Sequence, residues 1–270
     1  MIVFSASTFS TVWGLVAALA YALGALLGGR LSPQQSRNYL WVISLFHGLS
    51  VLASLIPEPD ATPRFGFAPA LSATAWLVLM VYTLEHHWFP QMKTRWVLSG
   101  AGLVAVLLPL FFPGHDLHAA ASLWLPLHWA LGMASYALFA AAVVHAGLMN
   151  RAERQIRLAE ADPSGLPLMT LERLTFRFVH IGFFLLTATL FAGLLFGERL
   201  YGSDNALRWD HKTVLSILAW LTYALLIWGR QARGWRGPLA IRLLYFGSAM
   251  LLLAYVGSRF VLEVLLHKVL

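Results

Sequence analysis

The segment WDHKTVLSILAWLTYALLIWGRQARGWRG, Trp209 to Gly237, decides the fold class of this chain. It opens with four polar or interfacial side chains, continues as an apolar run over residues 213–229, and ends in a cluster of arginines. An apolar run of about 17–25 residues crosses the hydrocarbon core of a bilayer as a helix. This order of residues therefore predicts a transmembrane helix with one end at each membrane surface.

The composition extends this prediction to the whole chain. Of 270 residues, 59% are hydrophobic and only 11% are charged, and the mean hydropathy is +0.69. A soluble domain has about a quarter charged residues. Eight apolar runs are expected to span the membrane, over residues 8–28, 39–56, 69–84, 97–112, 126–149, 175–196, 213–229 and 243–266. We therefore expect an all-α polytopic bundle, with residues 1–270 forming a single integral membrane domain.

The basic residues predict the orientation. Loops after the odd-numbered runs contain twelve of them: Arg30, Arg37, Lys93, Arg95, Arg151, Arg154, Arg157, Arg173, Arg230, Arg233, Arg236 and Arg242. Loops after runs 2, 4 and 6 contain four: Arg64, Arg199, Arg208 and Lys212. Basic loops stay on the cytoplasmic side, so both termini are expected outside. Short basic loops flanking membrane spans do not indicate a nucleic-acid partner; lipid bilayer is the expected surrounding.

The absence of cysteine excludes several kinds of site. With no thiol in the chain, disulfides, a Cys-x-x-Cys redox pair, thiolate ligation of haem, iron–sulfur clusters and thiolate zinc sites are all ruled out.

The ten histidines fall into two predicted layers. The outer layer has His128 and His211 at the starts of runs 5 and 7, His267 at the end of run 8, and His115 and His118 in a loop. The inner layer has His47, His145, His180, His86 and His87. Two neutral imidazoles on facing helices can hold haem iron axially.

Each histidine also has a simpler interpretation. Those near the headgroups, including His86, His87, His115 and His118, are expected as amphipathic interfacial residues. His47 lies deep in run 2, where a polar ring is costly, so a specific packing role and a functional role remain equally open. Arg259, about two turns inside run 8, either pairs with Glu263 or binds an anionic group such as a haem propionate or a lipid phosphate.

Three segments resemble the cytochrome c assembly family, the haem-handling membrane proteins of CcsA, CcmC and HemX-like type. They are LHWALGMASYALFAA from Leu127, LERLTFRFVHIGFFLLTATLFAG from Leu171, and the segment from Trp209 with its downstream GWRG. The resemblance covers residues 127–267, with a weaker HemX-like feature, FHGLSVL, around His47. It implies that His128 and His267 are axial ligands of haem iron at the outer side, and that Trp209 and Asp210 end a haem-facing outer motif.

Departures from the family pattern indicate which branch of the family this chain resembles. GERLYGSDNALR, before Trp209, lacks the run of tryptophans found in cytochrome c synthetases, His211 replaces a proline, and Trp228 stands where those proteins have a membrane-embedded histidine. The resemblance therefore points to the HemX-like or YpjD-like branch, and to an assembly or haem-handling factor instead of a catalyst of covalent haem attachment.

The leading hypothesis is a multi-pass bacterial inner-membrane protein that binds haem b noncovalently. His128 and His267 would be the axial pair, His47 a candidate inner site, and Arg259 a propionate partner. A protein partner from a cytochrome or membrane-complex assembly system is expected. The alternatives are a haem electron-transfer subunit, which needs a second histidine pair from His47, His145 or His180, and a transporter or accessory subunit without haem.

Overall fold

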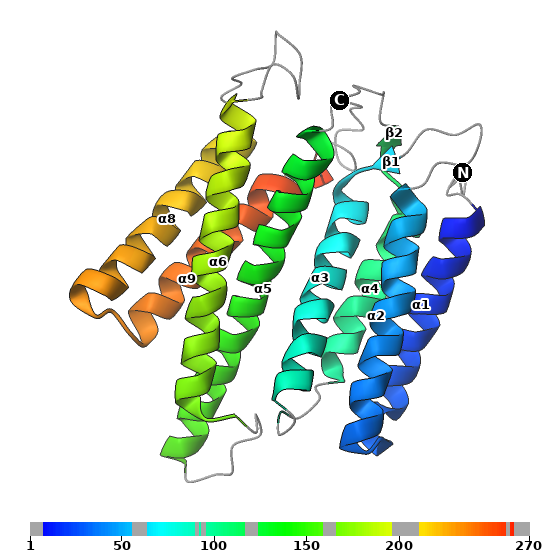
Figure 1. Cartoon of the computed structure of the whole chain (residues 1–270), viewed down its shortest axis with the longest axis horizontal. Helices are drawn as coiled ribbons and strands as arrows, with labels where there is room; N and C mark the ends of the chain where they lie inside the picture. Colours follow the sequence, from blue (N-terminus) through cyan, green and yellow to red (C-terminus); the bar gives the residue numbers. More distant parts are fainter. Residues whose placement is uncertain are drawn as a thin grey trace. The chain divides into compact units, whose positions relative to one another are not determined.

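The protein is a bundle of α-helices (Figure 1). The computed structural model describes residues 8–55, 64–89, 92, 96–116, 124–158, 166–195, 211–257 and 260–261. Described residues up to Asp116 form one compact unit, and those from Trp124 to Val261 form a second. We call these unit 1 and unit 2 and describe each by itself.

Unit 1 contains four helices and a short strand pair. The helices are α1 (Thr8–Leu27, continued by the 3-10 turn η1, Gly28–Arg30), α2 (Pro33–Leu55), α3 (Phe67–Trp88) and α4 (Val97–Phe111). Helix α1 packs against α2 and α4, and α3 packs against the same two helices. The core joins small residues of α1 to larger side chains: Ala17, Ala18, Ala20, Tyr21, Ile43 and Val106 are all buried. Tyr21 fits because Gly102 of α4 has no Cβ, which would overlap the tyrosine ring.

The strand pair shows how the chain returns within unit 1. Strand β1 (Arg64–Phe65) precedes α3, and β2 (His115–Asp116) follows α4. The two strands are antiparallel, with Arg64 opposite Asp116 and Phe65 opposite His115. Helices α3 and α4 therefore leave from and return to the same end of unit 1. This supports α4 as a crossing, although its 15 residues span only about 22 Å, less than the ~30 Å of a hydrocarbon core.

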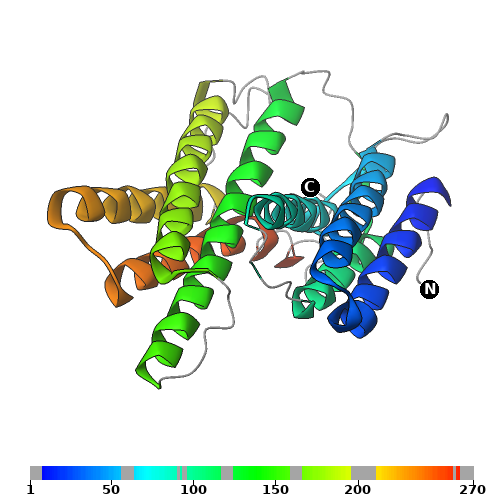
Figure 2. The ribbon, with the colours of Figure 1, turned by 60° about the horizontal axis from the view of Figure 1, so that its bottom comes forward.

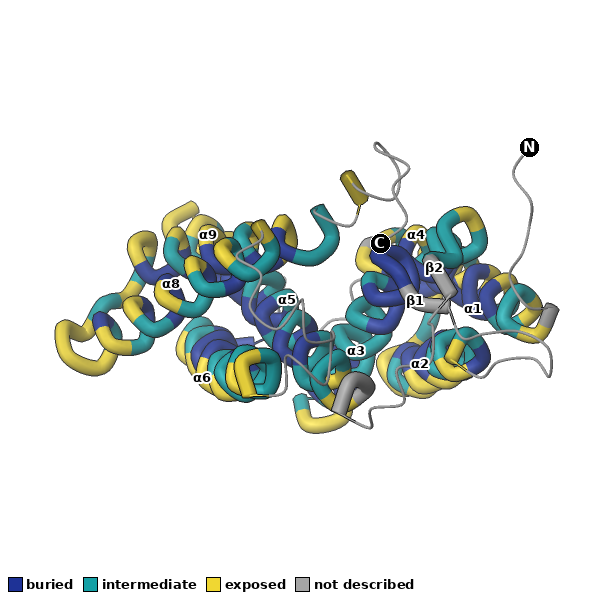
Figure 3. The backbone as a smooth tube through the Cα atoms, turned by 90° about the horizontal axis from the view of Figure 1, so that it is seen from above, coloured by how far each residue is buried: buried dark blue, intermediate teal, exposed yellow. Residues whose placement is uncertain are grey.

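Unit 2 consists of two antiparallel helix pairs. Helix α5 (Trp124–Arg157) packs along α6 (Leu168–Leu195), and α8 (His211–Arg233) packs along α9 (Pro238–Leu252), which continues into a π-helical turn, η3 (Leu253–Gly257). The pair α8/α9 is inclined to the pair α5/α6 (Figure 2). Buried residues lie on the mutually facing sides of α5 and α6, and exposed residues on the outer side of α6 (Figure 3).

An aromatic pair at the centre of unit 2 joins the two helix pairs. The rings of Phe139 on α5 and Tyr223 on α8 stack with centroids 3.8 Å apart, and the Tyr223 hydroxyl lies 2.8 Å from Ser248 Oγ on α9. A Cβ on Gly182 would lie 3.2 Å from Phe139, and one on Gly247 would lie 2.9 Å from Tyr223 Cζ. Glycine at Gly247 therefore permits the close approach of α9 to the ring.

The helices confirm the predicted class, a polytopic helical membrane bundle. In the described part of the chain, seven helices are long and apolar enough to cross a membrane, and α4 is a shorter apolar helix. Helices α5 and α6 are longer than the apolar runs because basic turns at their connected ends stay helical. The expected last run, 243–266, begins earlier, at Pro238. Proline is favoured in the first helical turn, where its missing N–H has no partner to lose.

Candidate functional site

The candidate site in unit 2 is built around His128, one turn after the start of α5. The imidazole packs against α6, where it hydrogen bonds the backbone of Thr189. A Cβ on Gly193 would lie 3.5 Å from His128 Cε1, an ordinary contact distance, so the ring packs close to this glycine. The side chain is partly buried, in the seam between two helices.

Residues of α8 and η3 extend this site. Lys212, the second residue of α8, lies close enough to His128 for its charge to act on the imidazole. Its ammonium also lies 5.7 Å from the ring centroid of Tyr255 in the π-helical turn, and Tyr255 is 6.4 Å from Tyr136 of α5. We call His128, Thr189, Gly193, Lys212 and Tyr255 the His128 cluster.

The sequence singles out His128 but not most of its neighbours. Lys212 enters the sequence analysis as a basic loop residue and as part of a polar run, with no link to His128. Tyr255 has no signal because π-helical turns, which recur at functional sites, cannot be read from periodicity. The other expected site residues, His267, Arg259, Trp209 and Asp210, lie outside the described residues. His211 is exposed at the first residue of α8, as expected of an interfacial side chain.

His47 lies in the core of unit 1. Its side chain is fully buried, with Nδ1 2.8 Å from the Tyr21 hydroxyl and Nε2 3.0 Å from Ser72 Oγ. The Tyr21 ring also meets it edge-on, at 5.5 Å. Both ring nitrogens are engaged, so ligation of a metal would require breaking one of these hydrogen bonds. The sequence left a packing role and a functional role open for His47, and this geometry favours the packing role.

The other inner-layer histidines differ in burial and in their partners. His145 is buried in unit 2, hydrogen bonded through Nδ1 to the Ala141 carbonyl, whereas His180 is exposed and donates from Nδ1 to the Phe176 carbonyl. In unit 1, His86 is buried beside Tyr82 instead of lying at the surface, which corrects the interfacial interpretation of this residue. His87 is exposed, in agreement with that interpretation.

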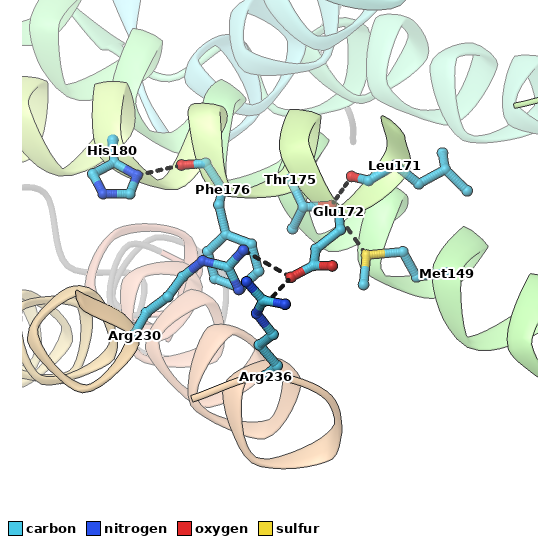
Figure 4. A network of polar contacts seen from close by, with 8 residues as sticks. All are labelled: Met149, Leu171, Glu172, Thr175, Phe176, His180, Arg230 and Arg236. Carbon is cyan, nitrogen blue, oxygen red and sulfur yellow. Dashed lines mark hydrogen bonds and ion pairs between the residues drawn. The ribbon is translucent and has the colours of Figure 1, made fainter. Parts of the chain in front are cut away.

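A charged network lies at the opposite end of unit 2. We call this end the basic end; it consists of the end of α5, the start of α6, the end of α8 and the start of α9. Glu172 of α6 accepts a 2.7 Å hydrogen bond from Arg230 Nη2 of α8 and lies 3.8 Å from Arg236 Nε, in the turn between α8 and α9 (Figure 4). The Arg230 guanidinium also stacks 3.6 Å over the Phe176 ring. Gly234 and Gly237 take positive φ values that allow this turn.

Residues of the three motif segments contact one another. Ser135 Oγ donates to the Gly182 carbonyl (3.0 Å), and Trp220 Nε1 donates to Thr187 Oγ1 (2.9 Å). Together with the Tyr223 stack and the Glu172 network, these contacts link α5, α6 and α8 along their length. Many motif residues therefore hold the helices of unit 2 together. His128 differs from them because it contacts the backbone of α6 and lies within electrostatic range of Lys212.

No preformed metal cage is visible in the described ranges, since no three His, Asp or Glu side chains there come close enough to hold an ion. A haem iron held by one or two histidines does not need such a cluster.

Comparison with known proteins gives a consistent result. The family described as cytochrome C assembly protein matches residues 35–266. The chain is similar to the inner membrane protein YpjD of Escherichia coli (strain K12), with 28% identity over 94% of this chain and 99% of that protein. It is also similar to a cytochrome c biogenesis protein CcsA of Prochlorococcus marinus, with 24% identity over 71% of this chain and 70% of that protein. No solved structure matches the chain.

Proposed function

Because this chain belongs to the cytochrome c assembly protein family, we propose that it is an inner-membrane haem-handling protein that binds haem b noncovalently at the His128 cluster. The observation that carries the proposal is the position of His128, partly buried in the α5–α6 seam within electrostatic range of Lys212. The similarity to an inner membrane protein over nearly the full length of both chains supports the membrane assignment.

The residues of the His128 cluster fit the requirements of haem. An imidazole supplies a nitrogen for the iron, and Lys212 supplies a cation for a propionate. The same end of α6 exposes Phe191, Leu194 and Leu195, which offer an apolar surface for a porphyrin ring. Bound haem would either be passed on to a partner protein or supply an iron centre that exchanges electrons. We propose His267 as the second axial ligand, on the resemblance alone.

The remaining contacts of unit 2 would hold the His128 cluster in place. Lys212 follows the first residue of α8, and the position of α8 against α6 depends on Trp220 at mid-length and Arg230 at the far end. We propose no haem role for His47, whose two hydrogen bonds make it a packing residue of unit 1.

A haem electron-transfer subunit is less well supported. It needs a second histidine pair. His145 of α5 is buried against the Phe178 ring, whereas His180 is exposed. One of these imidazoles is therefore buried and the other exposed, which is poor support for a second pair. The geometry supports one haem, at the His128 cluster.

Purification from haem-replete cells in mild detergent tests the proposal. We expect a Soret band, a haem content approaching one per chain, and sharp low-spin bands on reduction. A redox titration that shows two centres would favour the electron-transfer alternative. Protein that is reproducibly free of haem, from cells in which a control haem protein is loaded, would contradict the proposal.

A further inference from the structure

One exposed side of α6 carries polar groups, whose burial in a membrane costs free energy. Arg173, Arg177 and His180 are all exposed, although the helix that bears them is long and apolar enough to cross a membrane. Their spacing of four and three residues places them on one stripe of the helix. Ile181 and Phe184, at the deeper end of the same stripe, are 51% and 71% exposed. The stripe is therefore basic at one end and apolar at the other.

The stripe borders the contact between α6 and α8. Phe176 lies under Arg230, and successive helical residues are rotated by about 100°. This rotation places Arg173, Arg177 and His180 about 40–100° to one side of Phe176. Figure 4 shows Arg230 lying across Phe176, with Glu172 on one side and His180 on the other. Arg230 Nη1 is buried and has no hydrogen-bond partner among the residues the structure describes.

The depth of the stripe matches a membrane boundary. After Arg177, residues 178–195 contain no charged side chain, and 18 helical residues extend about 27 Å, close to the thickness of a hydrocarbon core. Arg177 is thus the last charge before the apolar span, at the level of lipid phosphates, with His180 about one turn deeper.

Among the residues that the structure describes, arginines outnumber acids at the basic end. Described residues there include Arg151, Arg154, Arg157, Arg173, Arg177, Arg230, Arg233, Arg236 and Arg242, against Glu153 and Glu172. Glu172 is already shared by Arg230 and Arg236, and Glu153 lies 3.6 Å from Arg157. Arg173 and Arg177 therefore face outward beside an excess of positive charge, and an arginine fork matches the oxygens of a phosphate.

We propose that this stripe binds one anionic phospholipid. Arg173 and Arg177 hold the headgroup phosphate, and an acyl chain lies along Ile181 and Phe184. His180 is exposed below the phosphate, and because its Nδ1 donates to the Phe176 carbonyl, Nε2 is the ring nitrogen left to meet a headgroup. A glycerol headgroup has hydroxyls that can hydrogen bond this nitrogen, so phosphatidylglycerol fits the stripe better than phosphatidylcholine. Basic pockets beside transmembrane helices bind anionic headgroups in this way.

Native mass spectrometry of the full chain, titrated with phosphatidylglycerol or phosphatidylcholine in mild detergent, tests the proposal. The wild type should retain one phosphatidylglycerol, with clear preference over phosphatidylcholine. The double substitution Arg173→Gln/Arg177→Gln should weaken retention about ten-fold or more, since each basic residue near an anionic surface contributes about five-fold. Both side chains are exposed, so the variant should remain folded, as checked by its thermal melting curve.

Arg154→Gln/Arg157→Gln is the matched control, because it removes the same charge from the basic end but from α5. Retention in this control should stay within about two-fold of the wild type. Equal losses in the two double variants would overturn the stripe as a specific site. Equal binding of the two lipids by the wild type would do the same without any variant. Displacement of the lipid by an equal concentration of inorganic phosphate would show a simple anion site instead.

Discussion

At the scale of single residues, Glu172 has the most consequential contacts in unit 2. It links the start of α6 to the end of α8 through Arg230, with side chains only 15% and 20% exposed, and to the more exposed Arg236. Glu172→Gln should lower the free energy of unfolding by about 1–3 kcal/mol, because the partly buried hydrogen bond from Arg230 loses the negative charge of its acceptor. Thermal or denaturant unfolding in detergent measures this.

Arg236→Gln serves as the comparison for Glu172. Its guanidinium is 69% exposed and 3.8 Å from the carboxylate, so the expected loss is below about 1 kcal/mol. Equal losses from Glu172→Gln and Arg236→Gln would show that the short Arg230 contact is not the important one.

His47 gives a second prediction at this scale. His47→Leu leaves the Tyr21 and Ser72 hydroxyls without this shared partner, which should destabilise the protein by about 1–2 kcal/mol. Haem content per folded chain should not change, as measured on the monodisperse fraction from gel filtration. A selective loss of haem in this variant would restore the inner-site hypothesis for His47.

The sequence predicted the depth of His47 but not its partners. Tyr21 and Ser72 lie on other helices and carry no mark in the sequence that they meet this imidazole. Lys212 was equally hidden, because its approach to His128 depends on how α8 packs against α5 and α6. The sequence can single out residues within the family motifs, but not the residues that packing brings next to them.

At the scale of helices, close approach at glycine decides the packing of α9. A Cβ on Gly247 would lie 2.9 Å from Tyr223 Cζ, and Tyr223 is held by Phe139 and Ser248. Gly247→Ala should therefore destabilise the protein by about 1–3 kcal/mol through overpacking. Gly147→Ala, whose Cβ would lie 3.9 Å from Tyr245 Oη, should be neutral or stabilising by about 0.5–1 kcal/mol.

Melting temperatures of the two alanine variants measure the difference. A Gly247→Ala variant as stable as Gly147→Ala would mean that the stacked rings give way at little cost. The helices themselves were predictable from hydropathy, whereas their packing points were not. The change from α9 to a π-helical turn at Leu253 was also invisible, because the apolar run continues without interruption.

At the scale of the whole molecule, the number of helices that cross the membrane determines which side each loop is on. The β1–β2 pair brings the chain after α4 back to the end of unit 1 from which α3 began, which supports α4 as a crossing despite its length. With the excess of basic residues in the loops after α1, α3, α5 and α8, we expect the basic end of unit 2 in the cytoplasm.

Reporter fusions measure this orientation. A reporter inserted near Pro163 should report the cytoplasm, and reporters near Pro59 and after Leu270 should report the outside. If the Pro59 and Pro163 reporters lie on the same side, α4 does not cross and the two predicted histidine layers are wrongly assigned.

The haem content and spin state of His128→Ala test the central claim most directly. Loss of one axial nitrogen should lower the haem content several-fold or shift the spectrum of bound haem toward high spin, and added imidazole should restore it in part. His211→Ala, at the same end of unit 2 and exposed, should leave the spectrum unchanged. A wild-type spectrum in His128→Ala, or the same change in both variants, would contradict ligation at the His128 cluster.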